Sequence, residues 1–459
     1  MPTDKNNKNF LDSLTQMPNR AGWLAMAEEA LEKNSANKAV LFIDLDRFKW
    51  VNDSLGHDAG DELLQLVSES IKSVLQEPSV NLNNSVSINI PGRMGGDEFV
   101  ALLQGVESVV QVEEVANRIV DVISQPISLK EAEVEIGASI GVASYPQDSK
   151  NLNDLLKYAD LAMYRAKHSG RNQVVFYQPE MIRQIEFRRD KQFAIRKALK
   201  EGSLSLDFQP IHDYKQQEII AIEAILNLEN SPSLSALDYA EVFSIADESQ
   251  VAIQLSEWMI EEGLEFIQRL DKSELNISLV TPVRPSHFHQ KTFADWLAER
   301  LESYELTPEN LVLSLNDTCL NVQRFPVEKQ LKALSKLGVE VAVQSFGSGN
   351  LSPLRLHDWP IDRLHLSSMF VTEITQKRSM ESMAIALIQM GLTLNKQVIA
   401  YGVRTPEQQA FLSSHQCNLM QGPYFGEPLT AAEMELLLIN DMEGDSDRTQ
   451  FLDEFADDY

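Results

Sequence analysis

Short apolar runs alternate with helical stretches through the second half of the chain, and this alternation constrains the fold more than any other feature. Helical patterns, for example at 256–270 and 380–392, separate most of the runs. Eight strands with helices between them are typical of a parallel (β/α)₈ barrel, so we predict such a barrel over residues 198–438. The eight strand-like runs are 204–211, 219–228, 275–280, 311–315, 339–343, 361–366, 397–401 and 419–425.

The first part of the chain, residues 1–175, has a different order of elements. An apolar run at 39–43 is typical of a buried strand, and it leads directly into Asp44-Leu45-Asp46. Helical spacing at 63–75, 109–123 and 153–168, with a strand pattern at 134–144, predicts an α/β sandwich with hairpins. Residues 176–197 are rich in charge and predict a connecting helix. Residues 439–459 form an acidic tail, and such composition is typical of a solvated, disordered end.

Composition and charge exclude several classes of protein. The 459 residues hold 40 Lys and Arg against 68 Asp and Glu, a net charge of −28, which argues against a nucleic-acid binder. No apolar run reaches the ~18 residues of a membrane span. The polar start lacks the pattern of a signal peptide, and two cysteines are too few for a disulfide framework. We therefore expect a cytoplasmic protein without a membrane segment.

The stretch from Arg93 to Phe99 combines two glycines with two acids. Gly95 and Gly96 allow a tight turn and the close approach of a large ligand, and Asp97 and Glu98 follow at once. Asp44 lies at the end of a buried strand, and two carboxylates from separate elements, together with phosphates, are a typical Mg²⁺ arrangement. Taken singly, either acid could equally be a surface group or a helix cap.

Two further groups of polar residues have a structural and a functional interpretation. Asn52, His57 and Asp61 could read guanine, because a carboxylate accepts two N–H bonds from the base and an amide both donates and accepts. Asp61 could instead start the helix that follows. Lys167 and Arg171 could hold a triphosphate, or they could oppose the dipole of a helix that ends near them.

The first part resembles a GGDEF domain of the diguanylate cyclase family. The resemblance implies that two GTP give cyclic di-GMP and pyrophosphate, in a homodimer whose protomers each carry one GTP. It implies Mg (or Mn) on Asp44, the carbonyl of Leu45 and Asp97, with Asp97 or Glu98 helping to deprotonate the attacking 3′-hydroxyl. It further implies substrate binding by Asn52, His57, Asp61, Gly95, Gly96, Lys167 and Arg171. The matching stretches are 12–20, 42–49, 52–53, 56–61, 93–99, 139–143 and 159–172.

One departure from that family concerns product inhibition. Many relatives carry Arg-x-x-Asp shortly before the glycines, whereas this chain has Val86-Ser87-Ile88-Asn89. We expect product inhibition through this site to be absent.

The second part resembles an EAL domain of the cyclic di-GMP phosphodiesterase family, with framework matches at 209–211, 223–225, 346–349, 401–403 and 421–422. That family uses acids, an Asn and a Lys at the C-terminal strand ends to bind two metals, and here Glu223 is retained. A single Glu among amides, hydroxyls and apolar groups cannot hold two metals. The other positions carry Asn227, Val280, Ser314, Gln344, Ser345, His365 and Tyr401.

These patterns predict a diguanylate cyclase with a phosphodiesterase-inactive EAL domain as a regulatory or interaction module. The replacements in the barrel could reflect lost selection, or a scaffold retained to bind a protein partner or a nucleotide. The alternative is a non-catalytic receptor or adaptor that responds to cyclic di-GMP or GTP through the EAL domain.

Overall fold

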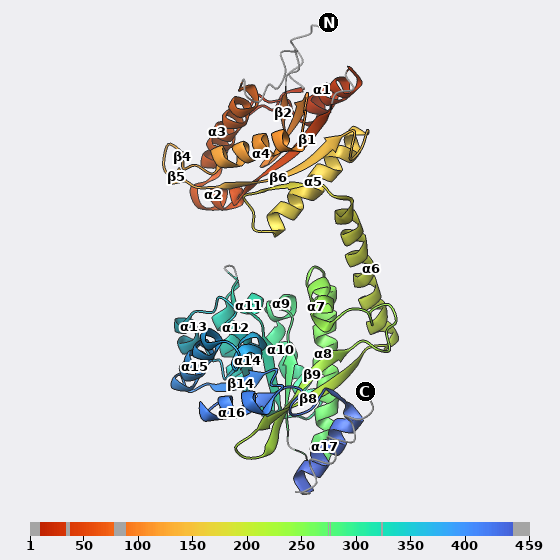
Figure 1. Ribbon diagram of the computed structural model, residues 1–459, viewed down its shortest axis with the longest axis vertical. Helices are drawn as coiled ribbons and strands as arrows, with labels where there is room; N and C mark the ends of the chain where they lie inside the picture. The colour runs from red at the N-terminus through yellow and green to blue at the C-terminus, as the bar shows by residue number, and fades with distance from the viewer. Residues whose placement is uncertain are drawn as a thin grey trace. The chain divides into compact units, whose positions relative to one another are not determined.

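The computed structural model of the chain describes residues 10–33, 37–77, 89–273, 275, 277–322 and 325–443. It divides into two compact units, Met1–Glu186 and Phe187–Tyr459 (Figure 1). Val86, Ser87 and Ile88, on which the expectation about product inhibition depends, lie outside the described residues, as does the acidic tail from residue 444 onward.

The described part of the first unit is built on a five-stranded sheet of order β2-β3-β1-β6-β7. The central strand β1 is antiparallel to β3 and β6, and β7 is parallel to β6. The expected strand at 134–144 divides into β5, in a small hairpin with β4, and β6. The strands are β1 (Lys38–Asp46), β2 (Ile90–Gly95), β3 (Glu98–Gln104), β4 (Ile127–Ser128), β5 (Glu133–Val134), β6 (Gly137–Tyr145) and β7 (Val174–Phe176). The helices are α1 (Arg20–Lys33), α2 (Phe48–Leu55), α3 (His57–Gln76), α4 (Val109–Ile123) and α5 (Leu152–His168).

All nine residues of β1 are buried, because helices cover both faces of the sheet. Successive side chains of a strand point to opposite faces. Leu41 and Ile43 therefore pack in the core that contains α3 and α4, and Val40 and Phe42 pack in the core that contains α1 and α5. By the same alternation Asp44 belongs to the face covered by α1 and α5.

Helix α5 lies directly against strand β6. A side-chain Cβ built on Gly141 would lie 1.9 Å from the carbonyl oxygen of Ala159 and 2.1 Å from the backbone nitrogen of Met163. No side chain fits between strand and helix here, so the absence of a Cβ at Gly141 fixes how closely α5 approaches the sheet.

The second unit is a closed barrel of eight strands within the described residues, and this confirms the predicted barrel. The expectation of an all-parallel ring was wrong for the first strand, since β8 is antiparallel to both β9 and β15. The reason is the short turn after β8, closed by the backbone N–H of Gln217 donating to the carbonyl of Asp213 at 2.8 Å. Such a turn can join only antiparallel neighbours. The ring strands are β8 (Ser205–Asp213), β9 (Glu218–Asn227), β10 (Ser278–Pro282), β11 (Leu311–Leu315), β12 (Glu340–Phe346), β13 (Arg363–Leu366), β14 (Gln397–Tyr401) and β15 (Leu419–Gln421), and β16 (Leu429–Thr430) pairs with β8.

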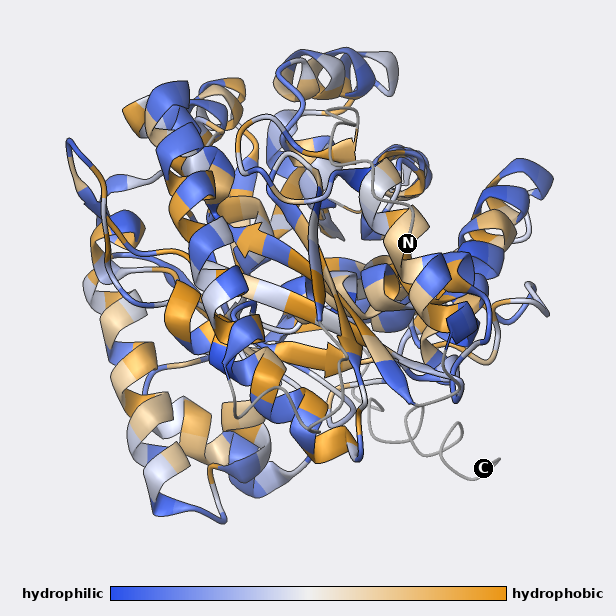
Figure 2. Ribbon diagram, turned by 90° about the horizontal axis from the view of Figure 1, so that it is seen from above, coloured by the Kyte–Doolittle hydropathy of each residue, from blue (hydrophilic) through white to orange (hydrophobic). Residues whose placement is uncertain are grey.

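Helices surround this ring, and most of the apolar core lies between them and the outer faces of the strands. Figure 2, which shows the whole chain coloured by hydropathy, has strands mostly in hydrophobic colours and helices with mixed faces. Among the described residues, no helix combines the length and apolar character needed to cross a bilayer. Helix α6 (Pro179–Glu201) crosses the boundary between the two units in the sequence. The helices of the second unit are α7 (Tyr239–Asp247), α8 (Val251–Lys272), α9 (Pro285–Phe288), α10 (Phe293–Ser303), α11 (Asp317–Leu320), α12 (Val327–Leu337), α13 (Pro353–Asp358), α14 (Ser368–Glu373), α15 (Arg378–Thr393), α16 (Pro406–Ser414) and α17 (Ala431–Glu443), with a 3₁₀ turn at Pro308–Asn310.

The inside of the barrel holds a second, smaller apolar cluster. Its buried members are Ile211, Ala221, Val280, Val312, Ala342 and Ile399. Residues two positions further along each strand share this inward face. The cluster therefore identifies which side chains at the strand ends point into the barrel.

Candidate active site

The carboxylate of Asp44 meets the ammonium of Lys167, with Nζ 2.6 Å from Oδ1. Asp44 is almost fully buried, and Lys167 reaches it from the last turn of α5. Burial raises the pKa of Asp44 to about 6, and the nearby charges of Asp97 and Glu98 act in the same direction, while Lys167 lowers it. Lys167 thus does more than oppose a helix dipole, because it neutralises a buried acid.

The turn between β2 and β3 brings the other two acids to the same place. Asp44 and Glu98 are register partners in β1 and β3, and the backbone N–H of Leu45 donates to the carbonyl of Asp97 at 3.3 Å. Gly95 and Gly96 have φ of 146° and 52°, and a Cβ on either would meet no atom within 4 Å. The turn therefore needs glycine conformationally and leaves open space beside the acids.

Glu98 is half-buried in a cluster of like charges. Burial raises its pKa, and Asp160 and Asp97 raise it further, while Lys167 and Arg20 lower it. Asp160 was not among the residues predicted for the site. The available signal was its position on α5 seven residues before Lys167, which places both on one face of the helix.

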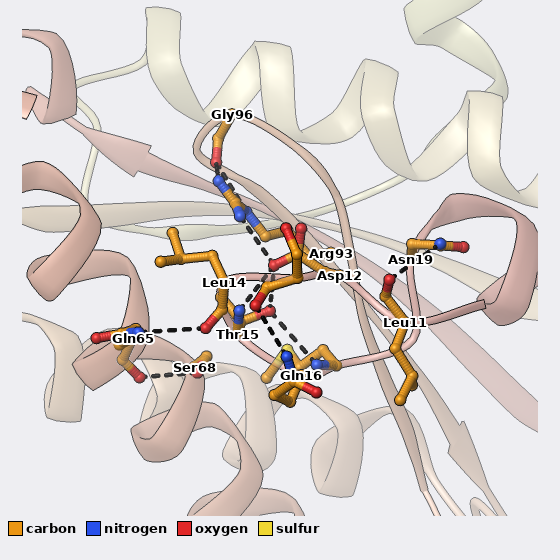
Figure 3. Close-up of polar contacts among 12 residues, drawn as sticks. Leu11, Asp12, Leu14, Thr15, Gln16, Asn19, Gln65, Ser68, Arg93 and Gly96 are labelled. Atoms are coloured by element: carbon orange, nitrogen blue, oxygen red, sulfur yellow. Dashed lines mark hydrogen bonds and ion pairs between the residues drawn. The ribbon is translucent and has the colours of Figure 1, made fainter. Parts of the chain in front are cut away.

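An arginine clamps the glycine turn to the start of the domain (Figure 3). Arg93 donates from Nε and Nη2 to the carbonyl of Gly96, at 3.0 and 2.7 Å, and from Nη1 to Asp12 Oδ1 at 2.9 Å. Asp12 also accepts from the backbone N–H and the hydroxyl of Thr15, at 2.8 and 2.7 Å. Burial raises the pKa of Asp12, but the hydrogen bonds from Thr15 and Arg93 outweigh it and leave that pKa below its usual value. Both stretches match the GGDEF family in sequence, but their contact with each other is visible only in the structure.

A second acid of β1, Asp46, holds the turn after α5. It accepts from the Ser139 hydroxyl at 2.9 and 3.1 Å and from the backbone N–H of Asn172 at 2.9 Å. The turn contains Arg171, which is exposed and has φ of 64°. Asp46 thus orders the loop that presents Arg171, a role that the sequence pattern did not reveal.

The residues expected to read guanine lie on the pair of helices α2 and α3. A Cβ on Gly60 would lie 1.9 Å from Asn52 Oδ1, so a glycine on α3 leaves room for the Asn52 side chain on α2. Asp61 is exposed and lies inside α3, which begins at His57, so the suggestion that Asp61 starts the helix was wrong. His57 is exposed and lines a cleft of about 530 Å³ between the start of α3 and the β4–β5 hairpin.

The donor set at the glycine turn fits a hard cation. Two carboxylates, Asp44 and Asp97, and the backbone of Leu45 supply the oxygen ligands that Mg²⁺ and Mn²⁺ prefer. In the described part of both units, no three His, Cys, Asp or Glu side chains gather in a metal-binding group.

In the barrel, the retained acid is tied to two glutamines. Gln421 Nε2 donates to Glu223 Oε2 at 2.8 Å and to Gln209 Oε1 at 3.0 Å. Glu223 is buried, and burial raises its pKa to about 7 although the bond from Gln421 lowers it. Burial therefore keeps this carboxyl in its neutral form to a higher pH than an exposed glutamate would allow.

The other strand-end positions hold uncharged side chains. Val280 lies in the apolar cluster inside the barrel, and Asn227 donates to Asp207 Oδ2 at 2.7 Å. His365 is buried and stacks on Tyr401 with ring centroids 5.1 Å apart. Burial, and then the charge of Arg363, lowers the pKa of His365 to about 3, so its imidazole is neutral.

Three more strand-end positions of the barrel carry hydroxyl or amide side chains. Ser314 is fully buried at the end of β11. Gln344 is half-buried in β12, and Ser345 is exposed with φ of 52°. The arrangement thus places amides and hydroxyls where the family's phosphodiesterases are expected to have acids.

Comparison with known protein families divides the chain in the same way. The model of the diguanylate cyclase GGDEF domain matches residues 9–173, and the model of the EAL domain matches residues 192–428. The chain is 31% identical over 427 residues to the bifunctional diguanylate cyclase/cyclic di-GMP phosphodiesterase MucR of Pseudomonas aeruginosa, and 30% identical over 431 residues to the cyclic di-GMP phosphodiesterase NbdA of the same species.

These alignments cover 92% and 93% of the chain, but they span 61% and 54% of the two relatives' own lengths. A solved structure of the MucR phosphodiesterase in complex with cyclic di-GMP is 25% identical and superposes with a TM-score of 0.51. It covers 53% of this chain and 99% of that one.

Proposed function

Because the chain belongs to the family of proteins that carry a GGDEF and an EAL domain in tandem, and thus to the proteins of cyclic di-GMP metabolism, we propose that its first unit is a diguanylate cyclase. It condenses two GTP into cyclic di-GMP and releases pyrophosphate. The observation that supports this most strongly is the convergence of Asp44, Asp97 and Glu98 with Lys167 beside an open glycine turn.

In this proposal, Asp44, Asp97 and the carbonyl of Leu45 hold Mg²⁺ or Mn²⁺. The bound cation supplies charge neutralisation on the phosphates and favours ionisation of the attacking hydroxyl. Lys167 and Arg171 hold phosphate oxygens. Lys167 also lowers the pKa of Asp44 below the value that burial alone would give, and this favours the ionised carboxylate.

Glu98 or Asp97 takes the proton of the 3′-hydroxyl. A general base works best when its pKa approaches the working pH, and the raised pKa of Glu98 moves in that direction. Asn52 and Asp61 read the guanine edge, with His57 nearby. Each protomer carries one GTP, so two copies must face each other to form both phosphodiester bonds.

The barrel, in this proposal, does not hydrolyse cyclic di-GMP. Support comes from its inward strand ends, where one acid, Glu223, is bound to Gln421 and the others are apolar or uncharged. Hydrolysis of a phosphodiester by two metals needs several carboxylates in one place. The barrel then acts on the cyclase as a regulatory or interaction module.

The test is to incubate the purified chain with GTP and Mg²⁺ and to measure cyclic di-GMP by chromatography. Asp97→Asn and Glu98→Gln keep side-chain shape and should each reduce the rate by at least a hundredfold, whereas Asp121→Asn, an exposed acid of α4, should leave it unchanged. The rate per chain should rise with protein concentration until the dimer saturates.

The same samples are incubated with cyclic di-GMP and Mg²⁺ or Mn²⁺ to test the barrel. Hydrolysis there would contradict the inactive barrel and leave the cyclase proposal intact. Failure to form product at concentrations that permit dimerisation, with GTP bound, would contradict the cyclase.

A further inference from the structure

The inward face of the barrel carries a polar layer at its C-terminal mouth. It lies one step beyond the apolar cluster, because its members follow cluster residues by two positions on β9, β11, β12 and β14. On β13 the outward residues Leu364 and Leu366 flank His365, which therefore points inward. The layer consists of Glu223, Ser314, Gln344, His365, Tyr401 and Gln421, with Gln209 from the antiparallel strand.

Neighbouring members of the layer are in contact. Gln421 bridges Glu223 and Gln209, Tyr401 and Gln421 are register partners in β14 and β15, and Tyr401 stacks on His365. The layer is therefore a continuous polar arc along adjacent strands, from β9 across β8 and β15 to β13.

Several buried atoms of the whole polar layer, which also includes Ser314 on β11, have no hydrogen-bond partner among the described residues. They are the hydroxyls of Ser314 and Tyr401, both ring nitrogens of His365 and Oε1 of Gln421. Ser314 has an exposed fraction of 0% and His365 of 2%. A buried polar group without a partner costs ~1–3 kcal/mol, so a set of them on one inward face indicates a site for a hydrogen-bonding ligand.

The chemistry of these atoms selects the class of ligand. Gln421 Oε1 can only accept, whereas the two hydroxyls and the neutral imidazole can each accept and donate. Glu223 adds a carboxylate, which favours a cation as its partner. The nearest inward cation on β13, Arg363, lies two residues before His365 and is held by Glu340 through Nε at 2.7 Å and Nη2 at 2.6 Å, while its Nη1 has no partner among the described residues. The carboxylate and the neutral acceptors at the mouth therefore favour a donor-rich cation.

We propose that the mouth of the barrel binds a small primary amine, whose ammonium group donates to Glu223 and to the accepting atoms of Gln421 and Tyr401. An ammonium has three donors, which matches one carboxylate and two neutral acceptors. This inference depends on the proposed absence of a metal site in the barrel, since a metal would take the Glu223 carboxylate.

The test is isothermal titration of the full chain, in physiological salt, with 1,4-diaminobutane and with 1,4-butanediol, which has the same length but no charge. The diamine should bind saturably at one site per chain, and the diol should bind at least tenfold more weakly. Glu223→Gln should weaken diamine binding at least tenfold, and Tyr401→Phe should weaken it severalfold.

Glu229→Gln removes one charge from an exposed position just after β9 and should leave the affinity for the diamine unchanged. This control excludes general attraction of amines to an acidic protein. Equal binding of diol and diamine, binding unaffected by Glu223→Gln and Tyr401→Phe, or no saturable binding would each overturn the proposal. Hydrolysis of cyclic di-GMP with Mg²⁺ or Mn²⁺ in a parallel assay would instead overturn the proposed inactive barrel, so the two failures are distinguishable.

Discussion

Lys167 Nζ lies 2.6 Å from Asp44 Oδ1, and this ion pair joins the last turn of α5 to the central strand of the first unit. The two residues serve different purposes in the proposed reaction, one holding phosphate and the other a metal. Their contact means that the protonation of the metal-binding acid depends on the phosphate-binding cation.

Cyclase activity should therefore rise with pH through about 6 as Asp44 loses its proton. Lys167 lowers the pKa of Asp44, so Lys167→Met should raise that pKa and move the midpoint of the pH profile upward, besides lowering the maximum rate. The measurement is the rate of cyclic di-GMP formation between pH 5 and 9. Lys157→Met, an exposed lysine of the same helix, is the matched control, and an unmoved midpoint in Lys167→Met would show that the pair does not tune the acid.

Ionisation of Glu223 should destabilise the barrel. Its pKa is raised from 4.5 in the unfolded chain to about 7 in the folded protein, so its stabilising contribution is fully present below 4.5 and is lost as pH rises through 7. The loss is on the order of 3 kcal/mol. Glu223→Gln should abolish this part of the pH dependence and be more stable than the wild type at pH 8. Urea unfolding of both chains at pH 5 and pH 8 checks the sign, and a loss of stability between the two pH values that is equal in the wild type and in Glu223→Gln would contradict it.

Gly60→Ala should weaken GTP binding through Asn52. The new Cβ would lie 1.9 Å from Asn52 Oδ1 and would displace that amide, so we expect KM for GTP to rise at least tenfold. Asn52→Ala should have a similar effect. Without the Asn52 amide there is no clash with the new Cβ, so adding Gly60→Ala to Asn52→Ala should raise KM for GTP little further. Additive losses in the double variant would show that Gly60 acts by another route.

Arg93→Lys should lower the cyclase rate while the fold persists. A lysine keeps the charge but cannot bond the Gly96 carbonyl and the Asp12 carboxylate together from one planar group. We expect a loss of more than tenfold in kcat, with a decrease in the free energy of unfolding of ~1–2 kcal/mol. Lys33→Arg, an exposed exchange on α1, controls for general effects, and full activity of Arg93→Lys would mean that the clamp is dispensable.

Periodicity in the sequence was sufficient to find the strands of the barrel ring and five of the longer helices, α3, α4, α5, α8 and α15, but it did not locate α1, α2 or the shorter helices around the barrel. Helix α4 begins and ends where the pattern predicted, and the barrel strands lie within a few residues of the predicted runs. The antiparallel direction of β8 was not predicted, because the pattern of a strand does not encode its orientation. That direction follows from the short turn between β8 and β9, which is closed by the backbone N–H of Gln217.

The site was predicted in part, for a physical reason. Acids in glycine-rich or strand-end contexts were recognisable, but the contacts of Arg93 with Asp12 and of Asp46 with Asn172 join residues far apart in the chain. Asp160 was missed because its effect on Glu98 acts through space from another element. Long-range pairs of this kind follow from the topology, which a single sequence does not display residue by residue.

The contact between Gly141 and the backbone of α5 leaves no compressible layer between the strand and the helix. In most interfaces between elements, side chains can change rotamer, so the two elements can shift relative to each other. Where two backbones are in direct contact, no rotamer change is possible and their separation is fixed. The spacing between the ends of the site that we propose to bind metal and phosphate is therefore fixed within the first unit. In the proposed cyclase, a signal that controls synthesis has more freedom to act on how often, and in what orientation, two protomers meet.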